Sequence, residues 1–297
     1  MPLSGRRRLL LSLLDALGGR VGNLDFQKLL FLYLQESKLV DGYDFVPYKF
    51  GAFSFTSYAD RRKLVDQGLL ANDDGHWVLN SEGKKAVGQT PDLLLSDFAR
   101  RHRQLRGDAL VAATYRRFPY YATRSEIATR VLLGDRDALE SINAARPVPT
   151  TAVVVTIGYE GRTLERYLNE LLASGVTLLC DVRRNPISRK YGFSKGTLSK
   201  ACEGVGIRYE HLPELGIASE QRRHLETQAD YDALFAEYER TNLPHQGDAL
   251  EKIRGWVRGG ARVALTCYER SPQQCHRHCV AEVLEREFGK GLTASHI

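Results

Sequence analysis

The stretch of the chain richest in reactive side chains is ALTCYERSPQQCHRHC, residues 264–279. Its apolar start predicts a buried strand that ends at Cys267, and the apolar spacing that follows predicts an amphipathic helix that begins near Cys275. A thiol at a helix N-terminus lies in the positive end of the helix dipole, to which His276 and Arg277 add. We therefore expect thiolate character at Cys275, which suits a nucleophile. The alternative is that both cysteines are small buried apolar residues, the commonest fate of a free cysteine.

The number and placement of the cysteines bear on redox state and metal binding. There are five, all in the C-terminal half, and no secretory signal precedes them, so we expect reduced thiols and a cytoplasmic protein. Cys275, His276, His278 and Cys279 resemble a ligand cluster. However, adjacent ligands on one helical turn point in different directions, and there is no Cys-x-x-Cys pair. The spacing therefore predicts no metal site, and it identifies no cofactor.

Length and charge set broad limits on the protein. A chain of 297 residues predicts two or three domains, and 43% hydrophobic with 26% charged residues is typical of a soluble globular protein. The net charge of +6 permits a nucleic-acid partner without requiring one. The opening GRRRLLLSLL has an apolar run too short to cross a bilayer and no small-residue cleavage site after it. We expect neither a signal peptide nor a membrane partner.

Residues 1–89 contain three predicted helices followed by a predicted β-hairpin. The helices run through Leu17, from after Asn23, and over about 57–67, and the strands 69–72 and 76–79 flank the turn Asp73-Asp74-Gly75. This order resembles the winged helix-turn-helix modules of prokaryotic regulators. The resemblance implies that the third helix enters the DNA major groove.

Basic side chains occur on the two elements that would contact the DNA backbone in such a module. They are Arg61, Arg62 and Lys63 on the third helix, with Lys84 and Lys85 after the hairpin. We expect them to bind phosphates of double-stranded DNA. The alternative is a protein-docking module whose basic residues form an ordinary solvated surface.

Residues 90–146 are expected to form a helical connector. Their apolar spacing is helical, with breaks at Gly107 and Pro119. The basic strings FARRHRQLR and YRRF are best interpreted as the polar surface of this scaffold, although they could extend a phosphate-binding surface. The stiff segment ARPVPT, residues 145–150, predicts a linker before the next domain.

Residues 151–297 alternate between predicted strands and helices. The expected strands are 152–157, 177–180, 207–210, 262–266 and 292–296. The alternation predicts a mainly parallel sheet with helices on both faces, an α/β layered domain in a chain that is α+β overall. In such domains ligands bind beyond the carboxyl ends of the strands.

Unusual polar residues cluster at those predicted strand ends, which indicates a single site. Candidate catalytic residues are Tyr159, Asp181, Cys267, Glu269 and Cys275, and candidate anion-binding residues are Arg183, Ser188, Arg189, His276 and Arg277. Guanidinium groups match phosphate and carboxylate oxygens, so we expect an anionic ligand. For Asp181 the alternative is a structural ion pair with Arg183 or Arg277.

The motifs around this site resemble a widespread prokaryotic family known as domain of unknown function 488. The motifs are TIGYEG (156–161), CDVRRNPISRKYGF (180–193), IRYEHLPELG (207–216), LTCYERSPQQCHR (265–277) and the terminal SHI (295–297). All candidate site residues named above for residues 151–297 fall on the family pattern, as do Gly158 and Pro186. Ile217 departs from it, because many members have a second glycine there. The resemblance implies no established activity.

Two functions from different classes are compatible with these patterns. In the first, the winged helix brings to DNA an enzyme that processes a nucleotide or nucleic acid, with Asp181 or Glu269 as acid or base and Cys267 or Cys275 as nucleophile. In the second, the protein is a transcription regulator that senses an anionic metabolite in a non-catalytic pocket. We favour the enzyme, because a regulator needs no reactive thiol beside two carboxylates.

Overall fold

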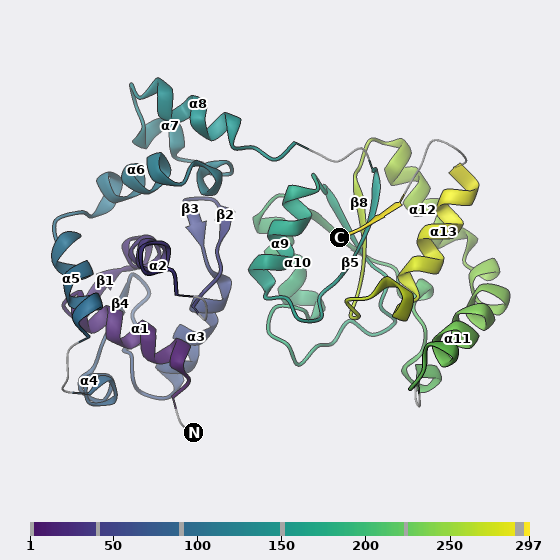
Figure 1. The fold of residues 1–297 in the computed structure, drawn as a ribbon, viewed down its shortest axis with the longest axis horizontal. Helices are drawn as coiled ribbons and strands as arrows, with labels where there is room; N and C mark the ends of the chain where they lie inside the picture. Colours follow the sequence, from purple (N-terminus) through teal and green to yellow (C-terminus); the bar gives the residue numbers. More distant parts are fainter. Residues whose placement is uncertain (1–2, 40–41, 89–91, 149–151, 223–224, 289–293) are drawn as a thin grey trace. The chain divides into compact units, whose positions relative to one another are not determined.

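A computed structural model describes residues 3–39, 42–88, 92–148, 152–222, 225–288 and 294–297 of the chain. These residues form two compact units, Met1–Arg146 and Pro147–Ile297, each with its own hydrophobic core (Figure 1). Parts of the predicted linker (residues 149–150) and of the last predicted strand (residues 292–293) lie outside the described residues.

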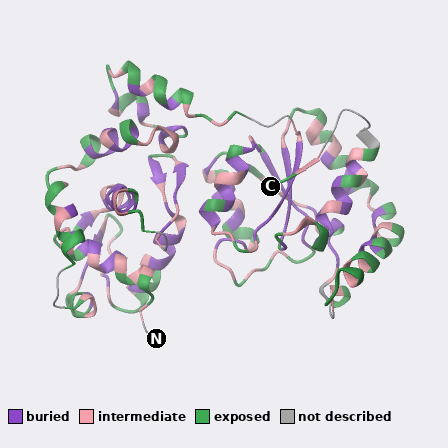
Figure 2. Cartoon of the chain, viewed as in Figure 1, coloured by how far each residue is buried: buried purple, intermediate pink, exposed green. Residues whose placement is uncertain are grey.

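The N-terminal unit is built around one buried helix. Helix α2 (Asn23–Ser37) is buried at nine successive positions from Phe26 to Leu34, and it lies between other elements of the unit (Figure 2). Around it pack α1 (Gly5–Ala16) and α3 (Phe55–Asp66), which Arg6 and Asp60 join by an ion pair of 2.8 Å. The predicted helices are therefore present.

Helix α2 begins one residue earlier than predicted. The sequence placed its start after Asn23, but the helix includes Asn23, and Gly22 holds the cap position without a side-chain hydrogen bond. The Asn23 amide instead donates to the carbonyl of Asp74. The side chain thus ties α2 to a distant turn and does not terminate its own helix.

The predicted hairpin is present, but its main strand partner differs. Strand β4 (His76–Val78) pairs with β1 (Arg20–Gly22), and only a single bridge joins Leu70 to Leu79. The buried Trp77 of β4 stacks on Phe26 of α2, with ring centroids 4.1 Å apart, so this small sheet is fastened to the central helix.

A second, unpredicted hairpin lies in the aromatic segment before α3. It consists of β2 (Val46–Tyr48) and β3 (Gly51–Phe53). Gly51 has a φ of +88°, a left-handed conformation that favours glycine, and a side chain there would collide with Tyr115. The tight turn explains why this short segment folds back on itself.

The remaining helices of this unit pack in two hydrophobic clusters. They are α4 (Ser81–Val87), α5 (Leu93–Arg101), α6 (Gly107–Arg117), α7 (Ala128–Val131) and α8 (Arg136–Ala144). Leu95, Phe98 and Leu110 pack into the cluster formed by α1 and α2. Of the helices expected to form a connector, α5 and α6 thus share a core with the first three helices. α7 and α8 pack with α6 in a second cluster that includes Val111, Ala128 and Ile142.

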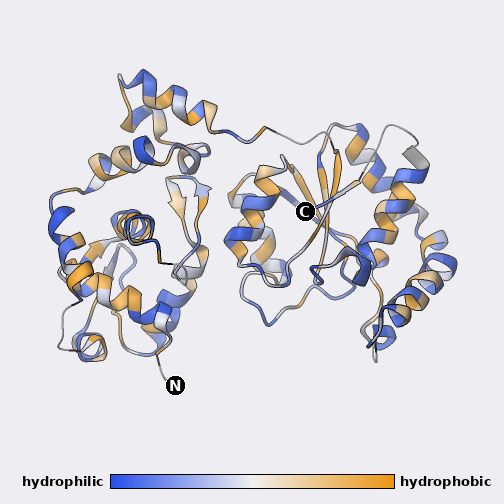
Figure 3. Cartoon of the chain, viewed as in Figure 1, coloured by the Kyte–Doolittle hydropathy of each residue, from blue (hydrophilic) through white to orange (hydrophobic). Residues whose placement is uncertain are grey.

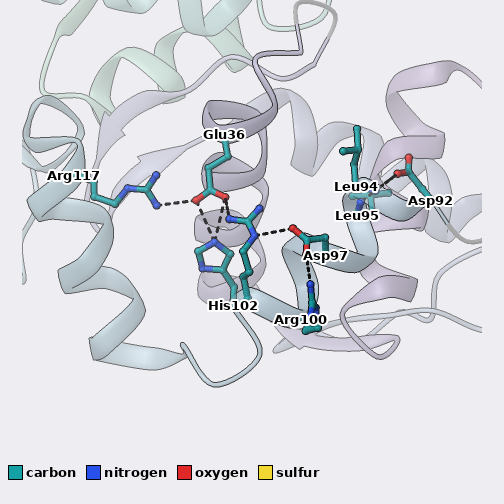
Figure 4. Close-up of polar contacts among 9 residues, drawn as sticks. Glu36, Asp92, Leu94, Leu95, Asp97, Arg100, His102 and Arg117 are labelled. Carbon is teal, nitrogen blue, oxygen red and sulfur yellow. Dashed lines mark hydrogen bonds and ion pairs between the residues drawn. The ribbon is translucent and has the colours of Figure 1, made fainter.

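A partly buried carboxylate near the end of α2 joins this helix to α5 and α6 (Figure 4). Glu36 accepts hydrogen bonds from Arg101 and Arg117, both 2.8 Å, and its carboxylate lies 3.1 Å from the ring of His102. Asp92 caps α5 by accepting from the backbone amides of Leu94 and Leu95. These three basic residues therefore belong to the scaffold, as the sequence indicated.

The C-terminal unit confirms the predicted α/β fold. Its five strands are all parallel, in the order β7-β6-β8-β5-β9. Their bounds are β5 (Val154–Gly158), β6 (Leu178–Asp181), β7 (Arg208–His211), β8 (Val263–Cys267) and β9 (Ala294–His296). β5, β6 and β8 are buried at every position and hydrophobic along most of their length (Figure 3), as expected for strands covered on both faces.

Helices cover both faces of this sheet. α9 (Leu164–Ala173) and α10 (Lys195–Gly204) lie on one side, and α12 (Gly247–Arg258) and α13 (Arg277–Phe288) on the other (Figure 1). α11 (Gln228–Thr241) packs with the second group. Short 3₁₀ helices occupy Pro119–Ala122, Pro213–Leu215, Ser219–Arg222, Leu243–His245 and Pro272–Gln274. No described helix is both long enough and apolar enough to cross a membrane.

Side-chain alternation decides which face each strand-end residue occupies. In β8, Val263 and Leu265 belong to the core under α12 and α13, so Cys267 points to that face. Thr266 points to the other face, where it accepts a hydrogen bond of 2.7 Å from Tyr167 of α9. Asp181 pairs in register with Thr266 and therefore shares the α9 face.

Two adjacent polar side chains on α2 fasten the second hairpin and the start of α3. Gln27 donates to the Ser57 hydroxyl (2.6 Å) and accepts from the Ser54 amide (2.9 Å). Lys28 is buried, and its ammonium group donates to the carbonyl of Ala52 at 2.8 Å. Burial lowers the pKa of Lys28 to about 7.

This lowered pKa predicts a pH-dependent stability. The unfolded chain binds the Lys28 proton more tightly than the folded chain does, so burial of the charge destabilises the fold at pH 7, and the penalty falls as pH rises towards 10. Relative to Lys28→Met, the free energy of unfolding of the parent should increase by on the order of 2–3 kcal/mol between pH 7 and 9.5. Urea titrations measure it, with the exposed Lys63→Met as control. Parallel curves for the parent and Lys28→Met would contradict it.

Candidate functional site

A polar cavity of about 240 Å³ opens at the carboxyl edge of the parallel sheet. Its lining comes from the segments after β5, β6 and β8, from residues 217–222 and from the start of α13. The lining residues are Tyr159, Arg183, Arg184, Asn185, Ile187, Ile217, Arg222, Cys267, Tyr268 and His276. This is the edge at which doubly wound α/β domains bind ligands.

Cys267 and His276 lie together in this cavity wall. The Nε2 atom of His276 lies 3.0 Å from the carbonyl of Val182, which can only accept, so Nε2 carries the proton. The other ring nitrogen, Nδ1, is therefore a lone-pair donor, and it lies 3.9 Å from the Cys267 sulfur. The carboxylate of Glu269 lies 3.5 Å from the same sulfur and also pairs with Arg222.

A second thiol approaches the same group. One ligand atom each of Cys267, Cys275 and His276 lies within 4.8 Å of the others, and all three residues are buried. A hydrogen bond from Cys275 holds the pKa of Cys267 well below its usual value against the effect of burial, and the positive charge of Arg222 acts in the same direction. These three residues could hold a metal ion.

The expectation of a thiolate at Cys275 is corrected by this geometry. Burial raises the pKa of Cys275 well above its usual value. The helix itself begins two residues later, at Arg277, and the Cys275 amide donates to Pro272 in the preceding turn. The field at the start of α13 thus does not keep Cys275 ionised, and the more acidic thiol is Cys267.

Asp181 lies behind the cavity wall and not in it. Its buried carboxylate accepts from Nε and Nη2 of Arg183, at 2.8 and 2.5 Å, and from the Tyr209 hydroxyl at 2.6 Å. With these hydrogen-bond partners, the carboxylate is not accessible from the cavity. Its contacts therefore fit a structural ion pair with Arg183 better than an acid–base role.

The ion pair positions Arg183 in the wall. Its Nη1 atom donates to the Tyr159 hydroxyl (3.0 Å) and to the carbonyl of Phe193 (2.8 Å). The Tyr159 ring stacks on Phe193 with centroids 4.3 Å apart. Asp181 therefore fixes Arg183, and Arg183 with Phe193 fixes Tyr159. Pairing with Asp181 raises the pKa of Arg183 although burial opposes it.

The side chain of Arg277 is committed to the loop after β8. It is fully buried, and it donates to the carbonyls of Glu269 (2.6 Å) and Arg270 (3.0 Å) and to Thr156 (3.3 Å). The loop also passes close to Gly158, where an added Cβ would lie 1.7 Å from the Glu269 carbonyl oxygen. The expected anion-binding role of Arg277 is therefore wrong.

Ser188 and Arg189 also lie outside the cavity lining as the structure describes it. The Ser188 hydroxyl accepts from the Lys190 amide at 3.1 Å, and its amide donates to Ser194 at 3.0 Å, so it closes its own loop. Arg189 is exposed. The sequence analysis missed Arg184 and Arg222, which do line the cavity.

The sequence of this unit matches a known domain family. Residues 163–284 match the model described as Domain of unknown function DUF488. A comparison with curated proteins found no match, and neither did a comparison with solved structures. The match supports the resemblance seen in the motifs.

The DUF488 match includes most of the cavity. Arg183, Arg184, Arg222, Cys267 and His276 lie within residues 163–284, whereas Tyr159 precedes them. Ile217, the position at which the chain departs from the resemblance, adds an apolar side chain to the wall of the cavity.

The basic residues of the N-terminal unit differ in their availability. Arg61 donates to the carbonyls of Asp73 and His76, and its guanidinium lies 5.5 Å from the centre of the Trp77 ring. It fastens α3 to the hairpin, so a phosphate contact expected from Arg61 is not supported. Arg62, Lys63 and Lys84 are exposed, and Lys85 pairs with Glu82 at 2.7 Å.

The ion pair behind the DUF488 cavity predicts a large stability effect. Asp181→Asn would leave the guanidinium of Arg183 buried without a counter-charge, which should cost about 3–5 kcal/mol. Urea denaturation measures this change. Glu251→Gln, which removes exposed ion pairs with Arg254 and Arg258, should cost less than about 1 kcal/mol. A similar small loss in both variants would contradict a structural role for Asp181.

Proposed function

We propose that this is a DNA-associated protein whose C-terminal unit binds the phosphate group of a nucleotide or nucleic acid and acts on it beside Cys267 and His276. The observation that carries the proposal is the group of three arginines, Arg183, Arg184 and Arg222, around one cavity at the carboxyl edge of the sheet. A guanidinium group donates two parallel hydrogen bonds to two oxygens of a phosphate, and it remains charged at every physiological pH.

Charge balance identifies the most important of these arginines. Asp181 offsets the charge of Arg183, and Glu269 offsets that of Arg222. Arg184 is exposed, and its guanidinium donates to a neutral carbonyl, that of Pro213, at 3.4 Å. The positive charge that an anion would neutralise therefore comes mainly from Arg184.

The remaining lining favours a nucleotide over a simple metabolite. Tyr268 is 45% exposed beside the cavity, and an exposed aromatic ring offers a surface on which a base can stack. A volume of about 240 Å³ is small for a ligand pocket, so it suits a phosphate and its sugar while the base remains at the mouth.

The N-terminal unit supports the association with DNA. The elements run in the order α1, β1, α2, β2, β3, α3 and β4. In this proposal they form a winged helix, with α3 as the helix that would enter the major groove. Arg62 and Lys63 are exposed on α3, opposite the buried Leu64 side that packs on the core. In this proposal Arg61 holds the wing in place while Arg62 and Lys63 contact phosphates.

The anion pocket predicts a selective loss of ligand binding. Arg184→Met should weaken binding of a nucleoside 5′-monophosphate about 10- to 100-fold, because a charge-assisted hydrogen bond contributes about 1.5–3 kcal/mol. Titration calorimetry measures the affinity. Arg189→Met, an equal charge change on the same loop but outside the cavity lining, should bind like the parent. Equal affinities of all three proteins would contradict the proposed pocket.

The proposed DNA surface predicts a change in salt dependence. Arg62→Glu should weaken duplex binding and reduce the slope of log affinity against log salt by about 0.9 for the lost phosphate contact. Arg136→Glu, at an exposed position of α8, serves as a control of the same charge change. Fluorescence anisotropy at several salt concentrations gives both slopes. Identical slopes in the parent and Arg62→Glu would indicate a protein-docking module.

A further inference from the structure

We propose that Cys267, Cys275 and His276 bind a zinc ion whose fourth position is open to a water molecule or a ligand. The sequence alone argued against a metal, because it offered only neighbours on one helical turn. The fold replaces two of those neighbours by Cys267, at the end of β8. His278 and Cys279 take no part: the ring of His278 lies 2.7 Å from the Cys275 carbonyl, and Cys279 is packed in the core under α13.

The spacing of the donor atoms fits tetrahedral zinc. With zinc–sulfur bonds of about 2.3 Å and zinc–nitrogen or zinc–oxygen bonds of about 2.1 Å, neighbouring ligand atoms lie about 3.4–3.8 Å apart. The Cys267 sulfur lies 3.9 Å from Nδ1 of His276 and 3.5 Å from the Glu269 carboxylate. The Cys275 sulfur lies within 4.8 Å of the Cys267 and His276 ligand atoms. Small side-chain shifts would bring these three donors, Cys267, Cys275 and His276, to one ion.

The surroundings already orient the ligands as in known zinc sites. A zinc-binding histidine usually donates its second ring nitrogen to a carbonyl or carboxylate, which fixes the tautomer. His276 does so through Nε2 to Val182, at 3.0 Å. Arg277 anchors the backbone of Glu269 and thereby holds the loop that carries two of the ligands.

Charge also favours a divalent cation at this position. Two thiolates balance the charge of Zn²⁺, so the ion could be buried with its sulfur ligands at no net charge. The negative charge of the Glu269 carboxylate is balanced by an ion pair with Arg222. Soft sulfur ligands with one imidazole select zinc over Mg²⁺ or Ca²⁺.

The ion would border the anion pocket, because Cys267 and His276 are both part of its lining. The assignment of zinc depends only on the ligand geometry. Its action on a phosphate rests on the proposed function: an open fourth position would let the metal polarise a phosphate oxygen or a water molecule.

The test is the metal content of the full-length protein, purified under reducing conditions from zinc-supplemented cells. Elemental analysis should find about one zinc per chain in the parent and in Cys279→Ser, and less than about a tenth of that in Cys267→Ser and Cys275→Ser. Cys279→Ser is the matched control, since it removes a buried thiol from the same segment without touching the ligand set. Circular dichroism establishes that each variant is folded.

Cobalt provides a second readout that does not depend on the metal acquired in the cell. Reduced, metal-free parent protein titrated with Co²⁺ should develop thiolate-to-cobalt charge-transfer bands and the intense visible bands of tetrahedral cobalt. Cys267→Ser should have weaker charge-transfer bands. A parent protein that takes up neither zinc nor cobalt, or that contains a Cys267–Cys275 disulfide and no metal, would overturn the proposal.

Ligand binding separates this proposal from the proposed function. Zinc uptake without any Arg184-dependent binding of a nucleoside 5′-monophosphate would support the metal site and contradict the anion pocket. Arg184-dependent binding to a protein that never takes up zinc would support the anion pocket and contradict the metal site.

Discussion

The arrangement of the site depends on the hydrogen bonds of the buried Arg277 guanidinium. From the first turn of α13 it donates to two successive carbonyls, those of Glu269 and Arg270, and to Thr156 on β5. It satisfies backbone acceptors that would otherwise be buried without partners. The loop between β8 and α13 is thereby folded back so that Cys267, at its start, meets Cys275 and His276, near its end.

Both units use buried polar groups in the same way. In the C-terminal unit Asp181 orients Arg183, and in the N-terminal unit Gln27 and Lys28 fasten the backbone before α3 to the central helix. Removal of one partner from such a pair leaves a buried polar group unsatisfied, which costs more than the bond contributes. These residues therefore fix the local geometry of each unit, and the exposed arginines beside them remain accessible to a ligand.

The sequence predicted the parallel sheet well, because β5, β6 and β8 are continuous apolar runs and their polar residues follow the strand ends. It predicted less well which polar residues face the cavity. Asp181 and Arg183 are two residues apart at the end of a strand, so they share one face. This spacing already favours an ion pair between them. The role of Arg61 depends on carbonyls of the hairpin turn, which no side-chain pattern reveals. The meeting of Cys267 with Cys275 depends on the loop that Arg277 folds.

The most direct test of the account is a crystal structure of the protein grown with a nucleoside 5′-monophosphate. The account predicts the phosphate in the cavity at the carboxyl edge of the sheet, within hydrogen-bonding distance of Arg184 and Arg222 and beside the group formed by Cys267 and His276. A nucleotide bound elsewhere on the protein, with this cavity occupied only by water, would contradict the claim that the strand ends form its functional site.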